Sequence, residues 1–218
     1  MQNLKIGLVD KQFHIDGFPL AARVIEIKGQ QGMNLAHLSL HVDDLEFALE
    51  CLREVDKSTS AVTREALWRS AVISYAKCFG SNARRKQLAS EKVFKGTPAE
   101  ARLAHNYFKS LRNKHFAHDE NAFGQALPAA IINPDGAERK VEKVVCLGAF
   151  ALTLEQGNGT NLWLLIETAL AWLRAQFDAL AEQIRLDLER TPHRELLCAP
   201  IIKYVVPGPD DVANPRPN

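Results

Sequence analysis

The sequence predicts a mainly α-helical protein: a bundle of about four helices with two short β elements. Three observations predict this class. Apolar residues recur every three or four positions over four long stretches, which is the spacing of one helix face. Segments rich in β-branched residues precede the first of these stretches and separate the third from the fourth. Serine, threonine, glycine and proline stand at the boundaries, where helices begin and end.

Length and composition bound the class further. The chain has 218 residues, which fits one large domain or one domain with an appendage. Hydrophobic residues make up 46% and charged residues 24%, as in ordinary soluble globular proteins. The formal net charge is +1, so any attraction to nucleic acid or to a membrane has to be local.

Cysteine usage and hydropathy indicate a cytoplasmic protein. Cys51, Cys78, Cys146 and Cys198 lie far apart and form no Cys-x-x-Cys pair, so neither a disulfide framework nor a zinc knuckle is indicated. The N-terminus has too short an apolar run for a signal peptide. The longest apolar stretch, 162–173, contains a glutamate and is too short to cross a bilayer. We therefore expect no membrane partner.

The first part of the chain is expected to change from strand to helix. Residues 1–30 form the predicted N-terminal β element, with strands at 5–9 and 22–27 around an Asp-Gly turn. A helical stripe follows, and it consists of Leu38, Val42, Leu45, Leu49 and Leu52. This helix begins either near Asn34 or only at Asp43, where a glutamate three residues on resembles a capping box.

Two further helices have clear start signals. The second helix is capped within 58–60 and ends at Phe79, before Gly80. The third has Thr97 as the N-cap and Pro98 at the first helical position. It is expected to end near residues 119–121, and its apolar face carries Ala104, Phe108, Leu111, His115 and His118.

A β-hairpin is predicted between the third and the fourth helix. It covers residues 127–147, and Asn133-Pro134-Asp135-Gly136 forms its turn. The last helix is expected over 161–190, where Pro192 stops it. The predicted helical domain therefore spans 31–195, and 196–218 form an extended C-terminal tail.

The segment 111–120 holds the densest group of reactive side chains, with two histidines between an arginine, a lysine and two acids. Histidine transfers protons near neutral pH, and arginine matches the oxygens of a phosphate. RNA carries its own nucleophile, the 2′-hydroxyl, so its cleavage requires a base, an acid and a cation but no metal or other cofactor. Arg112 and His118 meet that minimum. On an α-helix they would lie about 9 Å apart along the axis and roughly 120° apart around it.

The charge near this segment favours a phosphate-rich partner. Residues 83–115 hold nine lysines or arginines and two acids. Local concentrations of this kind drive the binding of nucleic acid. We therefore expect RNA contacts from Arg84, Arg85, Lys86 and Lys109.

The stretch Arg112-Asn113-Lys114-His115-Phe116-Ala117-His118 resembles the signature of the HEPN superfamily, most closely its AbiU-like abortive-infection branch. The resemblance covers about 33–190. It implies a homodimeric helical bundle in which two motifs face one cleft, acting as a metal-independent endoribonuclease of a defence or toxin system. Arg112 and His118 would then be catalytic, Asn113 a supporting polar residue, and Lys114 and His115 auxiliary. An antitoxin or another partner protein is also implied.

Other interpretations of the same residues stay open at this stage. Many members of the superfamily bind RNA or protein without cleaving anything. The two histidines could be hydrogen-bonded core residues, and Arg112 could pair with Glu46 or Glu50 of the first helix. A metal site is disfavoured because the spacing matches no helical zinc pattern. Its ligands would come from His105, His115, His118, Asp119 and Glu120.

Overall fold

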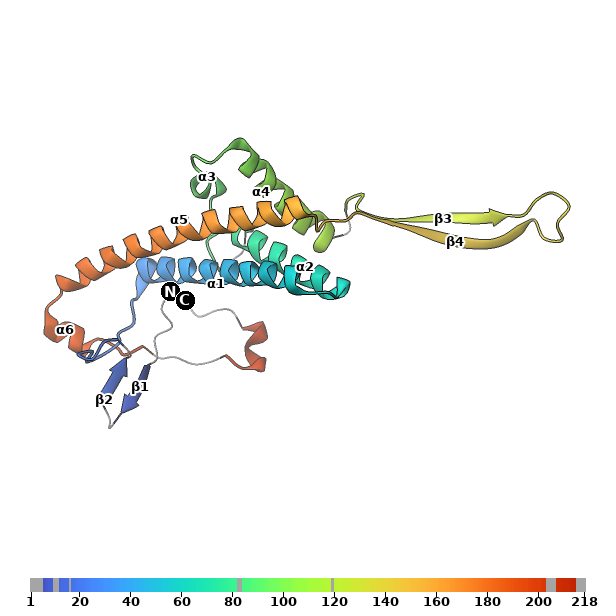
Figure 1. Cartoon of the computed structure of the whole chain (residues 1–218). Helices are drawn as coiled ribbons and strands as arrows, with labels where there is room; N and C mark the ends of the chain where they lie inside the picture. Colours follow the sequence, from blue (N-terminus) through green and yellow to red (C-terminus); the bar gives the residue numbers. More distant parts are fainter. Residues whose placement is uncertain are drawn as a thin grey trace. The chain divides into compact units, whose positions relative to one another are not determined.

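The computed structural model of the chain describes most of its residues, namely 6–9, 12–15, 17–81, 84–118, 120–202 and 207–214. Side chains are described for all of these except 6–9, 12–14 and 156. Among the described residues, six α-helices and one long antiparallel hairpin between helices confirm the mainly helical class (Figure 1).

Contacts along the chain define two units. Residues 1–43, 81–87 and 171–218 form the first unit, and residues 44–80 and 88–170 form the second. The two longest helices, α1 (Gly29–Lys57) and α5 (Gln156–Glu189), contribute residues to both units.

The N-terminal strands of the first unit are β1 (Ile6–Val9) and β2 (Gln12–Ile15), which pair antiparallel. The strand expected at 22–27 does not form. Instead, Ile25 makes a single bridge to Ile201, because the only chain segment that pairs with it among the described residues is the short stretch around 200–202. The unit also contains α6 (His193–Cys198) and a 3-10 turn, η2 (Pro209–Ala213).

Helix α1 begins earlier than either expected start. It starts at Gly29, whose φ of +81° favours glycine, and it continues through Asp43 without a new cap. Burial explains the continuity, because His41 and Val42 are both 2% exposed. The His41 Nε2 atom lies 2.9 Å from the carbonyl oxygen of Lys86, which attaches the segment around Lys86 to this part of the helix.

The second unit has an aromatic core. Helix α2 (Ala61–Phe79) begins as expected at Ser60, whose hydroxyl oxygen accepts from the Thr63 amide at 3.3 Å. Helices α3 (Ser90–Val93) and α4 (Ala99–Leu111) follow it. Buried aromatic side chains from these elements form the centre of the unit: Trp68, Tyr75, Phe79, Phe94 and Phe108.

One predicted cap and one predicted helix start are wrong. The Thr97 hydroxyl donates to the carbonyl oxygen of Phe94 at 2.9 Å, so it stabilises the turn after α3 and does not cap α4. The glycines at 157 and 159 belong to the first turn of α5, which starts five residues before the expected position. Asn158 between them donates to the Thr153 carbonyl at 3.0 Å, and this bond holds the first turn against the preceding segment.

The expected hairpin consists of β3 (Gly124–Ile132) and β4 (Val141–Phe150). Ala126 pairs with Gly148, and Leu127 pairs with Leu147, in an antiparallel register. Figure 1 shows the hairpin extending away from the helices of its own unit. Both faces carry exposed apolar residues, which is unusual for a strand pair in water. They include Leu127, Ile131, Ile132, Val141, Val144 and Leu147.

Because the hairpin side chains are almost all exposed, the helices should not depend on them. We expect that excision of 127–147, with Ala126 joined to Gly148 through an Asn-Gly turn, changes the unfolding free energy by less than about 1 kcal/mol. Urea unfolding followed by circular dichroism measures this change. A loss of several kcal/mol would show that the distal hairpin supports the helical core.

In the part of the chain that the structure describes, no helix combines the length and the apolar character that crossing a membrane requires.

Candidate functional site

The Arg-to-His motif lies where the backbone leaves the α-helical path. Helix α4 ends at Leu111 and continues as a π-helix, η1 (Arg112–Phe116). The Ala117 amide donates to the Arg112 carbonyl at 2.9 Å, five residues back instead of four. This wider turn holds more residues than an α-turn and changes which side chains share a face. The motif therefore does not follow the 3.6-residue period on which the expected stripe relied.

The sequence predicted that His118 points into the packed surface. This prediction is wrong, because the side chain is exposed. Phe108 and Leu111 are buried, His115 is half-buried, and His118 is exposed. The expected stripe ends at the π-helix. An exposed imidazole two residues after η1 can reach a molecule in solution, which a core histidine cannot do.

Arg112 takes its polar partner from the adjacent residue. Its Nη1 donates to the Asn113 side-chain oxygen at 2.9 Å, and this is the only hydrogen bond of the guanidinium among the described residues. No pair with the first helix forms, and Glu50 instead accepts from Arg53 at 3.2 Å. The half-buried guanidinium keeps most of its donors for a ligand, and an arginine offers five in all.

His115 is held by aromatic rings. Its ring centroid lies 5.3 Å from that of Phe116 and 5.6 Å from that of Phe123. Its Nδ1 atom is covered and has no hydrogen-bond partner, at a cost of about 1–3 kcal/mol for an unpaired buried polar atom. Packing against these rings therefore fixes the imidazole in place. The neighbouring Lys114 side chain is exposed.

His115 also lines a cavity of about 520 Å³ in the second unit. Helix α2 contributes Glu65 and Arg69 to its wall, and the remaining lining comes from the base of the hairpin and the segment 151–154. The Arg69 Nε donates to the Glu65 carboxylate at 2.6 Å, and the guanidinium lies over the Phe116 ring at 5.1 Å. Sequence reasoning missed Glu65 and Arg69, because nothing in the sequence distinguishes them from an ordinary i, i+4 surface pair.

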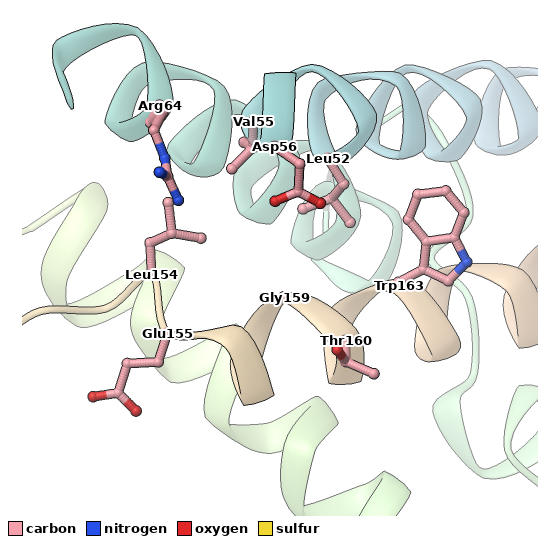
Figure 2. Close-up of a pocket in the computed structure, with 9 residues that line it drawn as sticks. All are labelled: Leu52, Val55, Asp56, Arg64, Leu154, Glu155, Gly159, Thr160 and Trp163. Atoms are coloured by element: carbon pink, nitrogen blue, oxygen red, sulfur yellow. The ribbon is translucent and has the colours of Figure 1, made fainter. Parts of the chain in front are cut away.

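A second cavity, of about 630 Å³, lies between the end of α1 and the start of α5 (Figure 2). Figure 2 shows the Asp56 carboxylate and the Trp163 ring reaching into this space, with Arg64 directed toward Leu154. Glu155 points away from it. No residue of the 112–118 motif lines this cavity, so it is separate from the candidate site.

The four predicted RNA-binding residues do not share one environment. Arg85 is only 5% exposed, and its Nη1 donates to the Leu40 carbonyl at 3.2 Å. It attaches its segment to α1 and is not on the surface, where an RNA contact would have to lie. Arg84 and Lys86 are exposed but belong to the first unit, whereas the half-buried Lys109 belongs to the second unit with the motif.

His105 is a core residue. It is 3% exposed, and its Nδ1 lies 2.7 Å from the Tyr75 hydroxyl. Burial, together with the positive charge of Lys109, lowers the pKa of His105 to about 4. Burial also raises the pKa of the Tyr75 phenol above its ordinary value. His105 is therefore neutral and internally bonded at physiological pH.

His105 cannot serve as a ligand in the alternative metal site, because it is buried and hydrogen-bonded to Tyr75 in the core. Of the other residues considered for it, Asp119 lies outside the described residues. Among the side chains that are described, no three histidines, cysteines or acids come close enough together to hold a metal ion.

No known protein family, curated protein or solved structure matches the chain. Its function has to be argued from the site itself.

Proposed function

We propose that this protein is a metal-independent endoribonuclease of a defence or toxin system, in which Arg112 binds the phosphate and His118 transfers protons. The observation that carries the proposal is the exposure of His118 two residues after a π-helical turn that begins at Arg112. His118 reaches solvent, and Asn113 holds the guanidinium of Arg112 from one side.

The chemistry uses groups that the motif supplies. An imidazole takes the proton of the ribose 2′-hydroxyl, and the resulting oxygen attacks the adjacent phosphorus. The guanidinium stabilises the negative charge that builds on the phosphate oxygens. The bond to the 5′-oxygen breaks, and an imidazolium returns a proton to that leaving group. The products are a 2′,3′-cyclic phosphate and a 5′-hydroxyl end.

A homodimer supplies both proton-transfer groups in this proposal. One His118 acts as base and the other as acid, and two Arg112 side chains flank the same phosphodiester. The resemblance to the HEPN superfamily supports this arrangement. The net positive charge of 88–115, the part of this basic stretch that lies in the second unit with the motif, supports RNA as the ligand.

Incubation of the purified protein with single-stranded RNA in excess EDTA tests the proposal. We expect internal cleavage that leaves cyclic phosphate ends, detected by gel electrophoresis and by end-group analysis. A substrate with 2′-O-methyl groups should resist cleavage, because its nucleophile is blocked. Cleavage that requires added metal, or that also proceeds on the methylated substrate, would contradict the mechanism.

The alternative is a non-catalytic module of the same superfamily that binds RNA or a partner protein such as an antitoxin. The apolar hairpin favours this alternative, since exposed apolar surface of this extent typically marks an interaction site. This reading predicts RNA binding that weakens with salt and leaves the strand intact.

A further inference from the structure

We propose that the cavity beside His115 is a nucleobase pocket, which takes one unstacked base of single-stranded RNA next to the phosphate bound at the motif. This inference rests on the proposed function for its choice of ligand. His115 lies three residues after Arg112 and three before His118, so one turn of chain links the cavity to both. The ribonuclease motif by itself assigns no base site.

The size of the cavity suits a base. Its volume of about 520 Å³ falls within the range of small-molecule pockets, roughly 300–1,000 Å³. Three elements of the second unit line it, α2, η1 and the base of the hairpin, together with the segment 151–154. A pocket that is built from separate elements around the motif can position an RNA strand before it reacts.

An aromatic surface is available for stacking. Phe150 lines the cavity and is 79% exposed, an unusually high exposure for a phenylalanine. A Cβ added at Gly148 would come within 2.8 Å of the Phe150 ring, so the glycine leaves the space that the ring occupies. Exposed aromatic rings are the platforms on which proteins stack unpaired bases.

Polar groups at the cavity can bond to the edge of a base. The Gln125 amide nitrogen donates to the Ala122 carbonyl at 3.1 Å, which fixes the amide and leaves its oxygen as an acceptor. The ion pair of Arg69 with Glu65 offers further donors and acceptors at the wall. The lining also contains the apolar side chains of Leu152 and Leu154. Apolar and aromatic surface together with a few polar groups suits a base, which has a flat apolar face and a polar edge.

Binding of a strand that cannot be cleaved tests the pocket separately from catalysis. The probe is a fluorescein-labelled octamer of single-stranded 2′-O-methyl RNA, and fluorescence anisotropy gives its affinity. We expect Phe150→Ala to weaken binding roughly tenfold to hundredfold, as loss of one stacked base does. Gly148→Ala should weaken it as well, because the new methyl group displaces the ring. Phe47→Ala removes another exposed phenylalanine of this unit, outside the cavity, and should have no effect.

Each outcome decides the proposal. Weaker binding by both hairpin variants, with the control unchanged and all thermal melts preserved, supports a base pocket. Three results would overturn it. Phe150→Ala could bind the octamer as tightly as the wild type, or it could lose as much affinity for an octamer without bases as for the ordinary one. The third is a wild type that does not bind the octamer at low salt. If the variants lose binding but the wild type never cleaves ordinary RNA, the pocket stands and the nuclease proposal fails.

Discussion

Replacing His118 by alanine is expected to lower the rate of RNA cleavage in EDTA by about 100-fold to 10,000-fold, the contribution of a positioned general acid or base. The imidazole is exposed, so its removal should leave the fold intact. A cleavage assay with single-turnover kinetics measures the rate, and circular dichroism checks the fold. His193→Ala removes another exposed histidine and should cleave at the wild-type rate.

Arg112→Ala is expected to lower the rate of RNA cleavage by about 100-fold to 1,000-fold, because the variant loses one preorganised donor group to the charge that develops on the phosphate. Arg112→Lys keeps the charge but not the planar fork, so it should recover only part of the rate. Arg194→Ala removes an exposed arginine from α6, outside the basic stretch 83–115, and serves as the matched control. Wild-type rates for the Arg112→Ala and His118→Ala variants together would leave the motif without a catalytic role.

Acid should destabilise the second unit through His105. Its pKa is about 4 in the folded protein and about 6.5 when exposed, so between these values the unfolded chain binds a proton that the folded chain does not. The stabilisation is therefore complete above pH 6.5 and is lost as the pH falls toward 4. From pH 7.5 to pH 4 the loss amounts to about 3 kcal/mol. Urea unfolding across this range measures it.

The variant His105→Gln isolates this effect. The glutamine amide can still hydrogen-bond the Tyr75 hydroxyl but takes up no proton in this range. We expect the variant to be less stable than the wild type at pH 7.5. Between pH 7.5 and pH 4 its unfolding free energy should fall by about 3 kcal/mol less than that of the wild type. Parallel declines in the two proteins would show that His105 does not govern the acid response.

Periodicity and turn chemistry predicted the elements that local sequence controls. Ser60 caps its helix through a side-chain hydrogen bond that needs only three residues of chain. The turn at 133–136 contains Gly136 with a φ of +87°, a conformation that favours glycine in any context. The mainly helical class and the inserted hairpin followed from such local rules.

The exact start of a helix and the burial of individual side chains depended on packing instead. Asp43 has every feature of a helix start, yet α1 passes through it because His41 and Val42 are buried. Arg85 looks like one member of a basic surface, but a carbonyl of α1 takes its guanidinium out of solvent. Burial of this kind depends on contacts between distant segments, which spacing along the chain does not encode.

The sequence alone determined the chemistry of the candidate site, because Arg112, Asn113 and His118 lie within seven residues of the chain and their side chains define what they can bind or transfer. Only the tertiary structure decided how that chemistry is presented. His118 is exposed just after the π-helical turn, and three separated elements line an open cavity beside His115. A single additional residue in a helical turn rotates every side chain after it, and an α-helical period cannot anticipate that change.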